Sequence, residues 1–552
     1  MSSSLIPGYR HGKALFAQKL LKGVTLGCRS LQTGCPSPST TGVAAATVDH
    51  ATIKPFEEIP GPKALPLIGN TLCFFPGIGE YSGLELDDLS RKMNEKFGPI
   101  SRFSGVLGRR DMVIIFRPED METTFRNEGQ WPFREGIQSM EYYRNVLRKD
   151  FYQDGGSVMT DQGPKWSEAR SKVNQPMMQP RISKQYVTPI ACVAQEFIDK
   201  TRAMRDENDE LPPDFINELY KWSLESIAYV ALDTRLGCLE SNLAPDSEPQ
   251  RIIDAVNTIL EEMFNLQFSM PFWKLFPTPT WKKFVQANDV FLEVSVKYVQ
   301  AAIDRAEKRK KTGAEDVVEP SVLERLLARA DVKTASIMAQ DMLFGGIDTT
   351  SFTTAITMYL LSRNKNKQEV LFGELKHFMP RKDSPLTEEM LEDMKYLKAV
   401  FKESMRMHPI VPWNMRKTVK EIVLSNYRVP EGVDVVMPNL MFRTSEDIYR
   451  QGKRFIPERW LKKRPSGNAA GSVEDFDACS HGKRHPFAFL PFGFGPRSCV
   501  GKRFAELEME ILLAKIIRNF RVDYKYGDMR FSSRLINTPI DPLRFELKDR
   551  SE

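Results

Sequence analysis

The sequence lacks three features that would each place the chain in another class of protein. Its N-terminal region has no run of about 18 apolar residues, so we expect no membrane-spanning anchor there. Its seven cysteines are scattered along 552 residues without a Cys-x-x-Cys pair, which indicates a reducing compartment rather than a disulfide framework. Its net charge of +6 is too small an excess to argue for nucleic acid, although it is compatible with an acidic protein partner.

Acidic side chains are missing from residues 1–48. This region has no Asp or Glu, whereas its Lys and Arg residues are spread among serines and apolar residues such as Leu15, Phe16 and Leu20. An acid-free, amphipathic composition is typical of a mitochondrial transit peptide, and a merely disordered tail is the alternative. We therefore expect residues 1–48 to be cleaved off after import, so that the mature protein no longer begins at Met1.

The rest of the chain is expected to form one large domain. Hydrophobic residues (41%) and charged residues (27%) occur at ordinary globular levels. Residues 49–70 contain Ile59-Pro60-Gly61-Pro62, which forbids a helix and predicts a linker with a proline-rich hinge. No linker-like stretch follows, so residues 71–548 are predicted to be a single domain. Alternating apolar runs at 100–104 and 112–116 predict strands of a small sheet.

The strongest candidate for a functional site lies at residues 490–503, Leu-Pro-Phe-Gly-Phe-Gly-Pro-Arg-Ser-Cys-Val-Gly-Lys-Arg. Its glycines and proline predict a tight turn that lets the backbone approach a flat group. The helical spacing of apolar residues after it places Cys499 at the start of a helix. Helix N-terminal amides and Arg497 would favour the thiolate form of this cysteine. The alternative is an inert buried cysteine, which is what most single free cysteines are.

Phe492, Gly495, Arg497, Cys499 and Gly501 together match the pattern F-x-x-G-x-R-x-C-x-G. By this motif the chain resembles the cytochrome P450 family of haem-thiolate monooxygenases, and it looks most like arthropod members of the mitochondrial group. The resemblance covers about residues 55 to 545. It implies a mainly α fold with a smaller β region (α+β), in which haem b lies between a long central helix and the helix after the cysteine loop. It also implies that Phe492, Arg497, Cys499 and Gly501 bind the haem, with Cys499 as the axial ligand of the iron.

A second motif, Gly345-Gly346-Ile347-Asp348-Thr349-Thr350, lies in a long predicted helix. Two glycines inside a helix cost about 1 kcal/mol each relative to alanine, so something must require the space. Close packing is one explanation for the glycines. The resemblance implies another, in which the small residues leave room for dioxygen while Asp348 and Thr349 relay protons for cleavage of the O–O bond.

Trp166, Arg170 and Arg416 are candidates for binding the haem propionates. Trp166 and Arg170 are spaced four apart and therefore share one face of a helix. An aromatic beside a surface cation is an equally good interpretation of these two residues alone. The resemblance implies that both bind a haem propionate, and that Arg416 reaches the second propionate.

The stretch from 394 to 409 carries the pair Glu403 and Arg406, which matches the pattern E-x-x-R. In the resemblance, this pair and Arg459 form a buried ionic network behind the haem. Removing one member would leave an unpaired buried charge, at a cost of about 3 to 5 kcal/mol. This role is structural rather than catalytic.

Basic residues occupy another face of the same helix. Lys398 and Lys402 lie on it, and Lys502 and Arg503 would extend it after the cysteine loop. A simply solvated charged face is the ordinary interpretation. The resemblance implies instead that Lys398 and Lys402 dock an acidic, adrenodoxin-like ferredoxin, which delivers the electrons.

Residues 263–285 combine aromatic side chains, prolines and lysines in a way that is unusual for a soluble protein. Trp273 and Phe276 are examples that stand beside lysines. Aromatics next to lysines suit a membrane interface, so we predict peripheral insertion into the matrix face of the mitochondrial inner membrane. Burial of this stretch in the core is the alternative.

The resemblance implies a reaction as well as a fold. One oxygen atom of O2 would enter a C–H bond of a lipophilic small molecule, a xenobiotic ahead of a steroid or ecdysteroid, with electrons from NADPH through ferredoxin reductase and ferredoxin. Two alternatives remain, a haem-thiolate isomerase or dehydratase that needs no redox partner and a non-catalytic haem sensor. The pair Asp348 and Thr349 argues against the first. A sensor would explain neither that pair nor the lysine face.

Overall fold

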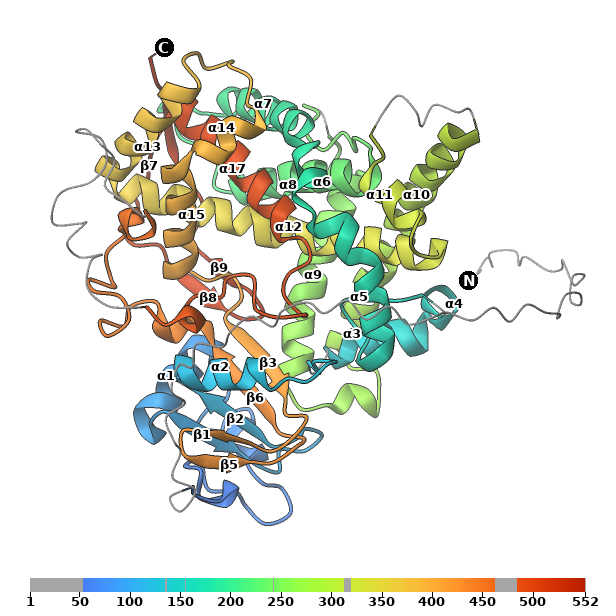
Figure 1. The fold of residues 1–552 in the computed structure, drawn as a ribbon, viewed down its shortest axis with the longest axis vertical. Coiled ribbons are helices and arrows are strands. Elements are labelled where there is room, and N and C mark those ends of the chain that lie inside the picture. Colours follow the sequence, from blue (N-terminus) through green and yellow to red (C-terminus); the bar gives the residue numbers. More distant parts are fainter. Residues whose placement is uncertain are drawn as a thin grey trace, which may run out of the picture. The chain divides into compact units, whose positions relative to one another are not determined.

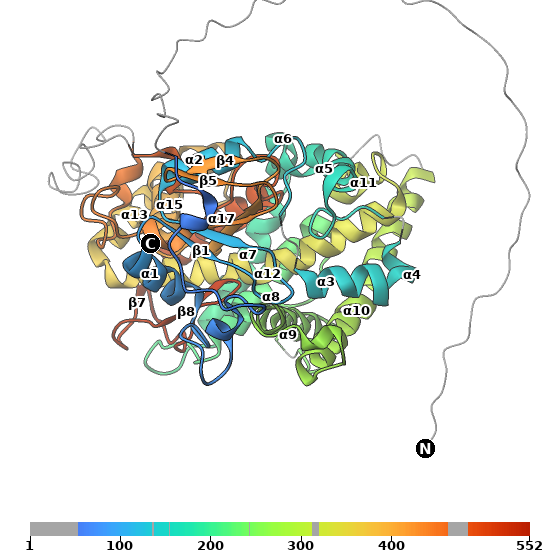
Figure 2. The ribbon, with the colours of Figure 1, turned by 90° about the horizontal axis from the view of Figure 1, so that it is seen from below.

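The computed structural model describes residues 53–551, apart from 135–136, 154, 242, 312–318 and 462–483. The chain divides into two units, Met1–Ala51 and Thr52–Glu552. The predicted transit peptide, residues 1–48, and the start of the predicted linker lie outside the described residues. The second unit holds all the elements described below, and Figures 1 and 2 show them in two perpendicular views.

Helices form most of the described chain, which confirms the predicted mainly α class with a smaller β region. The α-helices are α1 (Leu86–Phe97), α2 (Pro118–Arg126), α3 (Gln138–Tyr142), α4 (Lys149–Tyr152), α5 (Gly163–Met178), α6 (Pro180–Lys184), α7 (Val187–Ala203), α8 (Phe215–Leu232), α9 (Glu248–Phe268), α10 (Pro279–Lys311), α11 (Val322–Leu327), α12 (Val332–Arg363), α13 (Lys365–Phe378), α14 (Glu388–Asp393), α15 (Lys395–Met407) and α17 (Lys502–Asn519). Shorter helical turns are η2 (Phe56–Glu58), η3 (Thr71–Phe74), η4 (Tyr143–Leu147), η5 (Phe272–Lys274), η7 (Asn439–Phe442), η8 (Pro457–Trp460) and η9 (Pro486–Ala488).

Helix α12 is the central element of the helical region (Figure 1). It is apolar around most of its circumference, and a helix of that kind is buried on all sides. Asp331 caps it by accepting a hydrogen bond from the Thr334 amide at 2.8 Å. The hydroxyls of Thr353, Thr354 and Thr357 donate to the carbonyls four residues earlier, as Thr353 does to Thr349 at 2.7 Å, so these hydroxyls are satisfied within the helix. The helix packs against α8, α10, α15 and α17 and so reaches both chemical motifs.

The main sheet has four strands in the order β1-β2-β6-β3, and it lies with α1 and α2 below the helices in Figure 1. The predicted strands are present as β1 (Ile100–Phe103) and β2 (Met112–Ile115), which pair antiparallel. Strand β2 runs parallel to β6 (Asp434–Pro438), which pairs antiparallel with β3 (Trp413–Lys417). Two-stranded sheets are formed by β4 (Ile422–Leu424) with β5 (Tyr427–Val429), β7 (Phe520–Asp523) with β10 (Glu546–Asp549), and β8 (Phe531–Ser533) with β9 (Asn537–Pro539).

The described part of the proline-rich segment is held against the sheet. The Arg102 amide in β1 donates to the Pro60 carbonyl at 2.8 Å, and a Cβ on Gly61 would lie 2.1 Å from the Arg102 carbonyl oxygen. Only glycine allows so close an approach of two backbones. Within residues 53–551, outside the gaps given above, no helix combines the length and the apolar character needed to cross a membrane.

Candidate active site

The loop before α17 has backbone requirements that explain most of its motif. Gly493 and Gly495 have φ values of +70° and +71°, in the left-handed region that favours glycine. A Cβ on Gly495 would lie 2.4 Å from Oε1 of Glu128, so a larger residue has no room there. The Cys499 amide donates to the Phe492 carbonyl at 2.9 Å, which closes the turn. The loop thus presents Cys499 three residues before α17 begins.

Cys499 is both exposed and crowded. Its side chain is exposed, yet burial among protein atoms raises the pKa of its thiol, and the amides of Gly501 and Lys502 only partly oppose this. The thiol is thus accessible although protein atoms surround it. Among the charged groups, Arg170 is the cation with the largest lowering effect on this pKa, a partner that the sequence argument did not name, and the role of Arg497 toward the thiolate stays a prediction. A bound metal ion would supply the missing stabilisation, because it deprotonates a thiol that coordinates it.

Arg497 is held by contacts on the other side of the loop. Its guanidinium donates to the Pro132 and Asp161 carbonyls at 3.0 and 3.1 Å, and to Oε1 of Gln162 at 2.6 Å. It also lies 3.8 Å from the centre of the Trp166 ring, a close cation–π contact. These contacts join the cysteine loop to α5, where Trp166 and the nearby Arg170 are both buried.

Four arginines gather near this loop and repel one another. Burial, and after it the charges of Arg416 and Arg170, lower the pKa of Arg134 to about 10. Burial, and after it the charges of the other three, lower the pKa of Arg497 to about 9. Arg416 has a carboxylate partner, since its Nε donates to Oε2 of Glu128 at 2.5 Å. A cluster of this kind is suited to binding anionic groups.

Donors without partners point to the same conclusion. Nε1 of Trp166, Nε of Arg170 and Nη1 of Arg497 are buried and have no hydrogen-bond partner among the described residues. Buried donors are normally paired, so three of them around one loop indicate a bound group that accepts hydrogen bonds.

The two glycines in α12 serve different purposes. A Cβ on Gly346 would lie 2.8 Å from Cγ1 of Ile227 in α8, and Ser223 of α8 donates to the Gly346 carbonyl at 2.8 Å. Packing therefore explains Gly346. A Cβ on Gly345 would meet nothing within 4 Å, so this glycine borders open space. Each of the two interpretations of the motif thus fits one glycine.

The acid and the alcohol that follow the glycines have contrasting environments. Asp348 is buried, neither of its carboxylate oxygens has a partner among the described residues, and burial raises its pKa to about 7. The Thr349 hydroxyl donates to the Gly345 carbonyl at 2.9 Å, on the side of the helix that borders the open space. On α8, the pKa of Tyr220 is raised by burial and by the charge of Asp348. Asp348 can therefore hold or release a proton near neutral pH.

Comparison with known proteins identifies this arrangement. The family model described as Cytochrome P450 matches residues 59–546. The chain belongs to the cytochrome P450 family. Members bind haem through a cysteine thiolate and act as monooxygenases, so this P450 is an oxidoreductase that uses O2 and takes a lipophilic substrate.

Its curated relatives include insect P450s. It is 39% identical to "Probable cytochrome P450 301a1, mitochondrial" of Drosophila melanogaster, over 94% of this chain and 93% of that protein. It is 39% identical to "Probable cytochrome P450 12a5, mitochondrial" of the same species, over 90% and 91%. It is 37% identical to "Cytochrome P450 CYP12A2" of Musca domestica, over 94% and 95%.

The predicted ionic network of this P450 is brought together around Glu403, which is fully buried. Arg406 donates to both of its carboxylate oxygens at 2.7 and 2.9 Å, and Arg459 donates to Oε1 at 3.2 Å. The Trp460 indole and the Ile456 amide each add a bond at 2.9 Å. Five donated hydrogen bonds therefore satisfy this buried carboxylate.

The predicted docking lysines border a groove between α15 and α17, which we call the basic groove. Its volume is about 350 Å³, and it is lined by both of the predicted lysines and by Lys502 and Arg503. Lys398 donates to the Glu392 carbonyl at 3.3 Å, and neither Lys398 nor Lys402 forms an ion pair with a described residue. Their charges are therefore available to a partner.

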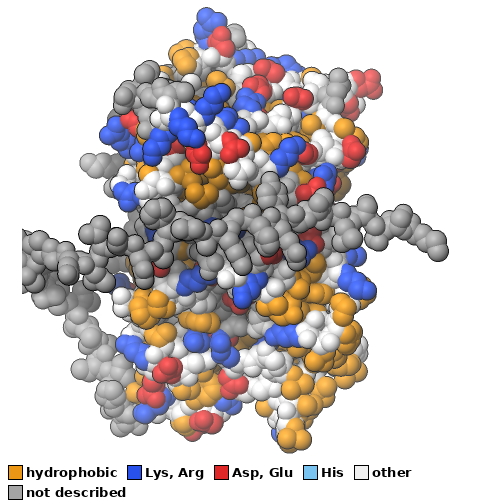
Figure 3. Space-filling view, turned by 90° about the vertical axis from the view of Figure 1, so that its right-hand side faces the viewer, with side chains coloured by type: hydrophobic (Ala, Val, Ile, Leu, Met, Phe, Trp, Pro, Cys, Tyr) orange, Lys and Arg blue, Asp and Glu red, His pale blue; other side chains and the backbone are white. Residues whose placement is uncertain are grey.

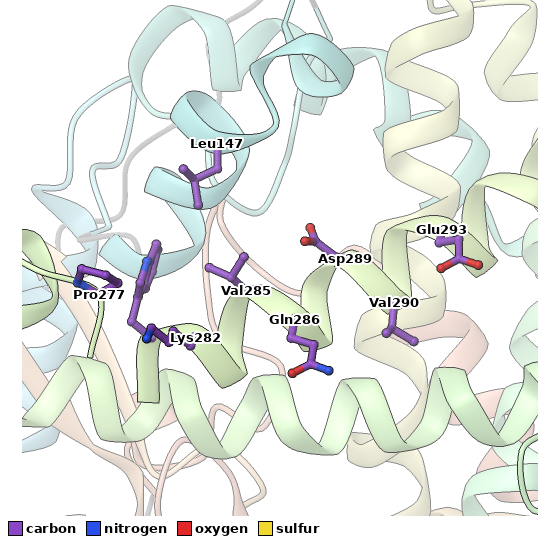
Figure 4. A pocket seen from close by; sticks show the side chains of 9 residues that line it. Leu147, Pro277, Lys282, Val285, Gln286, Asp289, Val290 and Glu293 are labelled. Atoms are coloured by element: carbon purple, nitrogen blue, oxygen red, sulfur yellow. The ribbon is translucent and has the colours of Figure 1, made fainter. Parts of the chain in front are cut away.

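The aromatic stretch at 263–285 divides between core and surface. Trp273 and Trp281 are buried and stack with ring centres 4.6 Å apart, as the core interpretation requires. Leu275 and Phe276 are 81% and 55% exposed, as the membrane interpretation requires. Beyond this loop, a groove of about 430 Å³ runs along α10, and Leu147 points from η4 toward it (Figure 4).

Several residues of the site carried no signal in the sequence. Arg134 and Glu128 lie in a stretch without a motif, and Trp460 and Tyr220 look like ordinary core aromatics. Each acquires a role only through contact with a residue far away in the chain.

Proposed function

We propose that this P450 binds haem b through Cys499 and hydroxylates lipophilic small molecules with electrons from an acidic ferredoxin, which an NADPH-dependent reductase reduces. Xenobiotics rank ahead of steroids or ecdysteroids as substrates. The observation that carries the proposal is the exposed sulfur of Cys499 near four arginines and three unpartnered buried donors.

The residues present fit haem b. Its iron would take the Cys499 thiolate, and its two carboxylates would take the unused donors of Trp166, Arg170 and Arg497, with Arg134 and Arg416 adding positive charge. Arg416 would contribute mainly charge, because its Nε is already bonded to Glu128. The haem, once bound, supplies the binding and reductive activation of dioxygen.

Residues of α12 would control protons in this reaction. Gly345 leaves space next to the helix, and the Thr349 hydroxyl lies on the same face. Asp348 has a carboxyl group whose pKa of about 7 lets it give and regain a proton at neutral pH. Because Asp348 is buried, bulk water is kept away from it, and its carboxyl group would pass on one proton at a time. An isomerase that needs no external protons would have little use for such a group.

The test of the ligand is Cys499→Ser. We expect the variant to lose its haem pigment, or to lose the long-wavelength band of the reduced carbon monoxide complex, because a serine oxygen is a poor ligand for iron. The measurement is the reduced carbon monoxide difference spectrum of the purified full-length protein. Cys192→Ser is the matched control, since Cys192 is also an exposed free cysteine. An unaltered spectrum in Cys499→Ser would end the proposal.

Electron delivery is tested on the basic groove. Lys398 and Lys402 have no acidic partner in the described chain, so an acidic ferredoxin would meet them without first displacing another ion pair. Replacing both by Glu should raise the ferredoxin concentration needed for half-maximal turnover by at least about tenfold, because two attractive charges become repulsive. Lys395, which already pairs with Asp393 at 3.1 Å, offers the control Lys395→Glu.

Two results would contradict electron delivery at this groove. One is an unchanged ferredoxin dependence in the double variant. The other is turnover of a peroxide substrate without any ferredoxin, which would favour the isomerase or dehydratase alternative. Substrate class is tested by screening sterols and insecticide-like compounds for a shift of the haem absorption band.

The names of two relatives support a mitochondrial location. We propose that the protein acts on the matrix side of the inner membrane as a peripheral protein. Exposed apolar residues on three neighbouring segments support this placement. The segments are neighbours because the Leu107 amide donates to Thr71 at 3.0 Å and a Cβ on Gly108 would lie 3.2 Å from Pro271. These contacts bring together exposed residues of three segments, which include Leu67, Leu72, Phe75, Ile78, Leu107, Phe272, Leu275 and Phe276. Hydrophobic side chains gather at the lower right of the face shown in Figure 3.

A further inference from the structure

We propose that docking at the basic groove is coupled to proton uptake by Glu510, a carboxylate of α17 in the lining of the groove. The inference rests on the proposed function and deepens it, since it concerns how the same acidic partner binds. It adds a pH-dependent step that no motif in the sequence suggests.

The geometry places acid and base on facing helices. Lys398 and Lys402 come from α15, and Glu506 and Glu510 come from α17 one helical turn apart, all four in the lining of one groove. Both carboxylates feel the charges of both lysines. A partner that covers the lysines therefore also changes the surroundings of the two carboxylates.

Few of the other charges in the groove remain unpaired. Lys184 of α6 is bound by Glu388 and Glu392 of α14, and Lys502 lies 3.8 Å from Glu506. The charged groups that line the groove together with Glu510 are Lys184, Glu388, Glu392, Lys398, Lys402, Lys502, Arg503 and Glu506, and those whose charges act on it most are Lys398, Glu506 and Lys402. The groove lining contains no histidine, and burial raises the pKa of both of its α17 carboxylates, that of Glu510 to about 7.

Burial raises the pKa of Glu510 to about 7, and the charges of Lys398 and Lys402 oppose that rise. An acidic partner would neutralise these lysines and add negative charge of its own. Both changes disfavour the ionised carboxylate, so the pKa of Glu510 rises further in the complex. Complex formation then takes up a proton wherever the pH lies between the free and bound pKa values.

The sign of the pH dependence follows from this shift. Binding is at its tightest below pH 7, where Glu510 is protonated in both states. It weakens as the pH rises from about 7 to the higher pKa of the complex, and is constant above that. A rise of half to one pKa unit on binding corresponds to an affinity loss of about three- to tenfold.

The experiment titrates the haem-loaded full-length protein with a purified acidic mitochondrial ferredoxin by calorimetry, between pH 6 and pH 8.5. Runs in two buffers with different ionisation enthalpies give the number of protons taken up directly. We expect a fraction of a proton per complex near pH 7.5, and an affinity that falls about three- to tenfold across the range. This measurement on the wild-type protein needs no variant to fold.

Two variants test whether Glu510 is the group that takes up the proton. Glu510→Gln should bind as tightly at pH 8.5 as at pH 6 and take up no proton from the groove, because the neutral side chain mimics the protonated acid. Glu392→Gln is the matched control, since it removes the same charge from the exposed rim of the groove. We expect it to tighten binding equally at every pH and to keep the wild-type slope.

The outcomes separate this inference from the proposed function. Ferredoxin binding that depends on Lys398 and Lys402 but takes up no proton would overturn the inference and leave the function standing. A pH slope that persists in Glu510→Gln would do the same. Absence of ferredoxin binding at any pH would overturn both.

Discussion

Residue identity says less about the chemistry of Asp348 than its surroundings do. The carboxyl group is buried without a partner, which raises its pKa to about 7, whereas Glu403 is equally buried but accepts five hydrogen bonds. Two acids of similar burial therefore have different surroundings: the carboxyl group of Asp348 has no partner among the described residues, whereas that of Glu403 is satisfied by five donors.

Asp348→Asn tests the raised pKa through stability. An aspartate in an unfolded chain titrates near about pH 3.9, and Asp348 in the folded protein titrates near about 7. Between these values only the folded state keeps the proton, so the stability contributed by the protonated acid is lost as the pH rises through this window. Asparagine does not titrate. The variant should therefore gain free energy of unfolding relative to wild type between pH 5 and pH 8, by up to about 3 kcal/mol.

Urea unfolding of the two proteins at both pH values measures this difference. The control is Asp528→Asn, because that side chain is 93% exposed and pairs only weakly with Arg363 at 3.4 Å. It should give the same difference from wild type at both pH values. A pH-independent effect of Asp348→Asn would mean that the carboxyl titrates normally.

At the scale of single elements, α12 must satisfy packing and chemistry within one turn. Gly346 allows α8 to approach, and Gly345 keeps open the space beside it. Both residues lower the intrinsic helix propensity, which the packing of this long buried helix offsets. The helix thus tolerates locally unfavourable residues because its stability comes from tertiary contacts.

The two glycines give a matched pair of substitutions. Gly346→Ala gains about 1 kcal/mol of helix propensity but overpacks against Ile227, which costs about 1 to 3 kcal/mol, so the free energy of unfolding should fall. Gly345→Ala meets no atom within 4 Å and should gain up to about 1 kcal/mol. Thermal unfolding measures both.

The affinity for carbon monoxide is a second quantity that should differ between the two glycine variants. Gly345→Ala should weaken carbon monoxide binding to the reduced protein, because its methyl group enters the space proposed for a diatomic ligand. Gly346→Ala should change that affinity little. The reverse order of effects would place the open space on the other side of the helix.

At the scale of the whole molecule, exposed apolar residues from distant segments form one surface. Leu275 and Phe276 lie in the chain between the buried tryptophans Trp273 and Trp281, so the loop is anchored by stacked rings at both ends while its tip is exposed. Large exposed apolar surfaces are uncommon on monomeric proteins and mark contact with membranes or partners. The anchoring also shows that Trp273 belongs to the core, so replacing it would test folding rather than membrane contact.

Leu275→Asp together with Phe276→Asp is therefore the test of membrane contact. The double variant should float with liposomes of inner-membrane lipid composition at a several-fold lower fraction than wild type, because buried apolar area and its favourable transfer are lost. Val332→Asp is the control, since Val332 is 53% exposed at the start of α12. Equal flotation of all three proteins would place the membrane contact elsewhere.

The sequence by itself determined the features that depend on consecutive residues. The cysteine motif, the Asp348 and Thr349 pair, the Glu403 and Arg406 pair and the first two strands all follow from local backbone needs or fixed spacing. A turn with positive φ favours glycine in any fold, and residues four apart on a helix share one face whatever packs around it.

Only the tertiary structure decided which residues meet across long stretches of chain. It joined Arg134 and Glu128 to the cysteine loop, divided the two glycines between packing and open space, and brought the charge of Arg170 to act on Cys499. It also set the pKa of Glu510, which burial raises and the charges of two lysines in the same groove oppose. Burial and long-range charge are sums over neighbours that no local spacing specifies, so these properties appear only once the chain is packed.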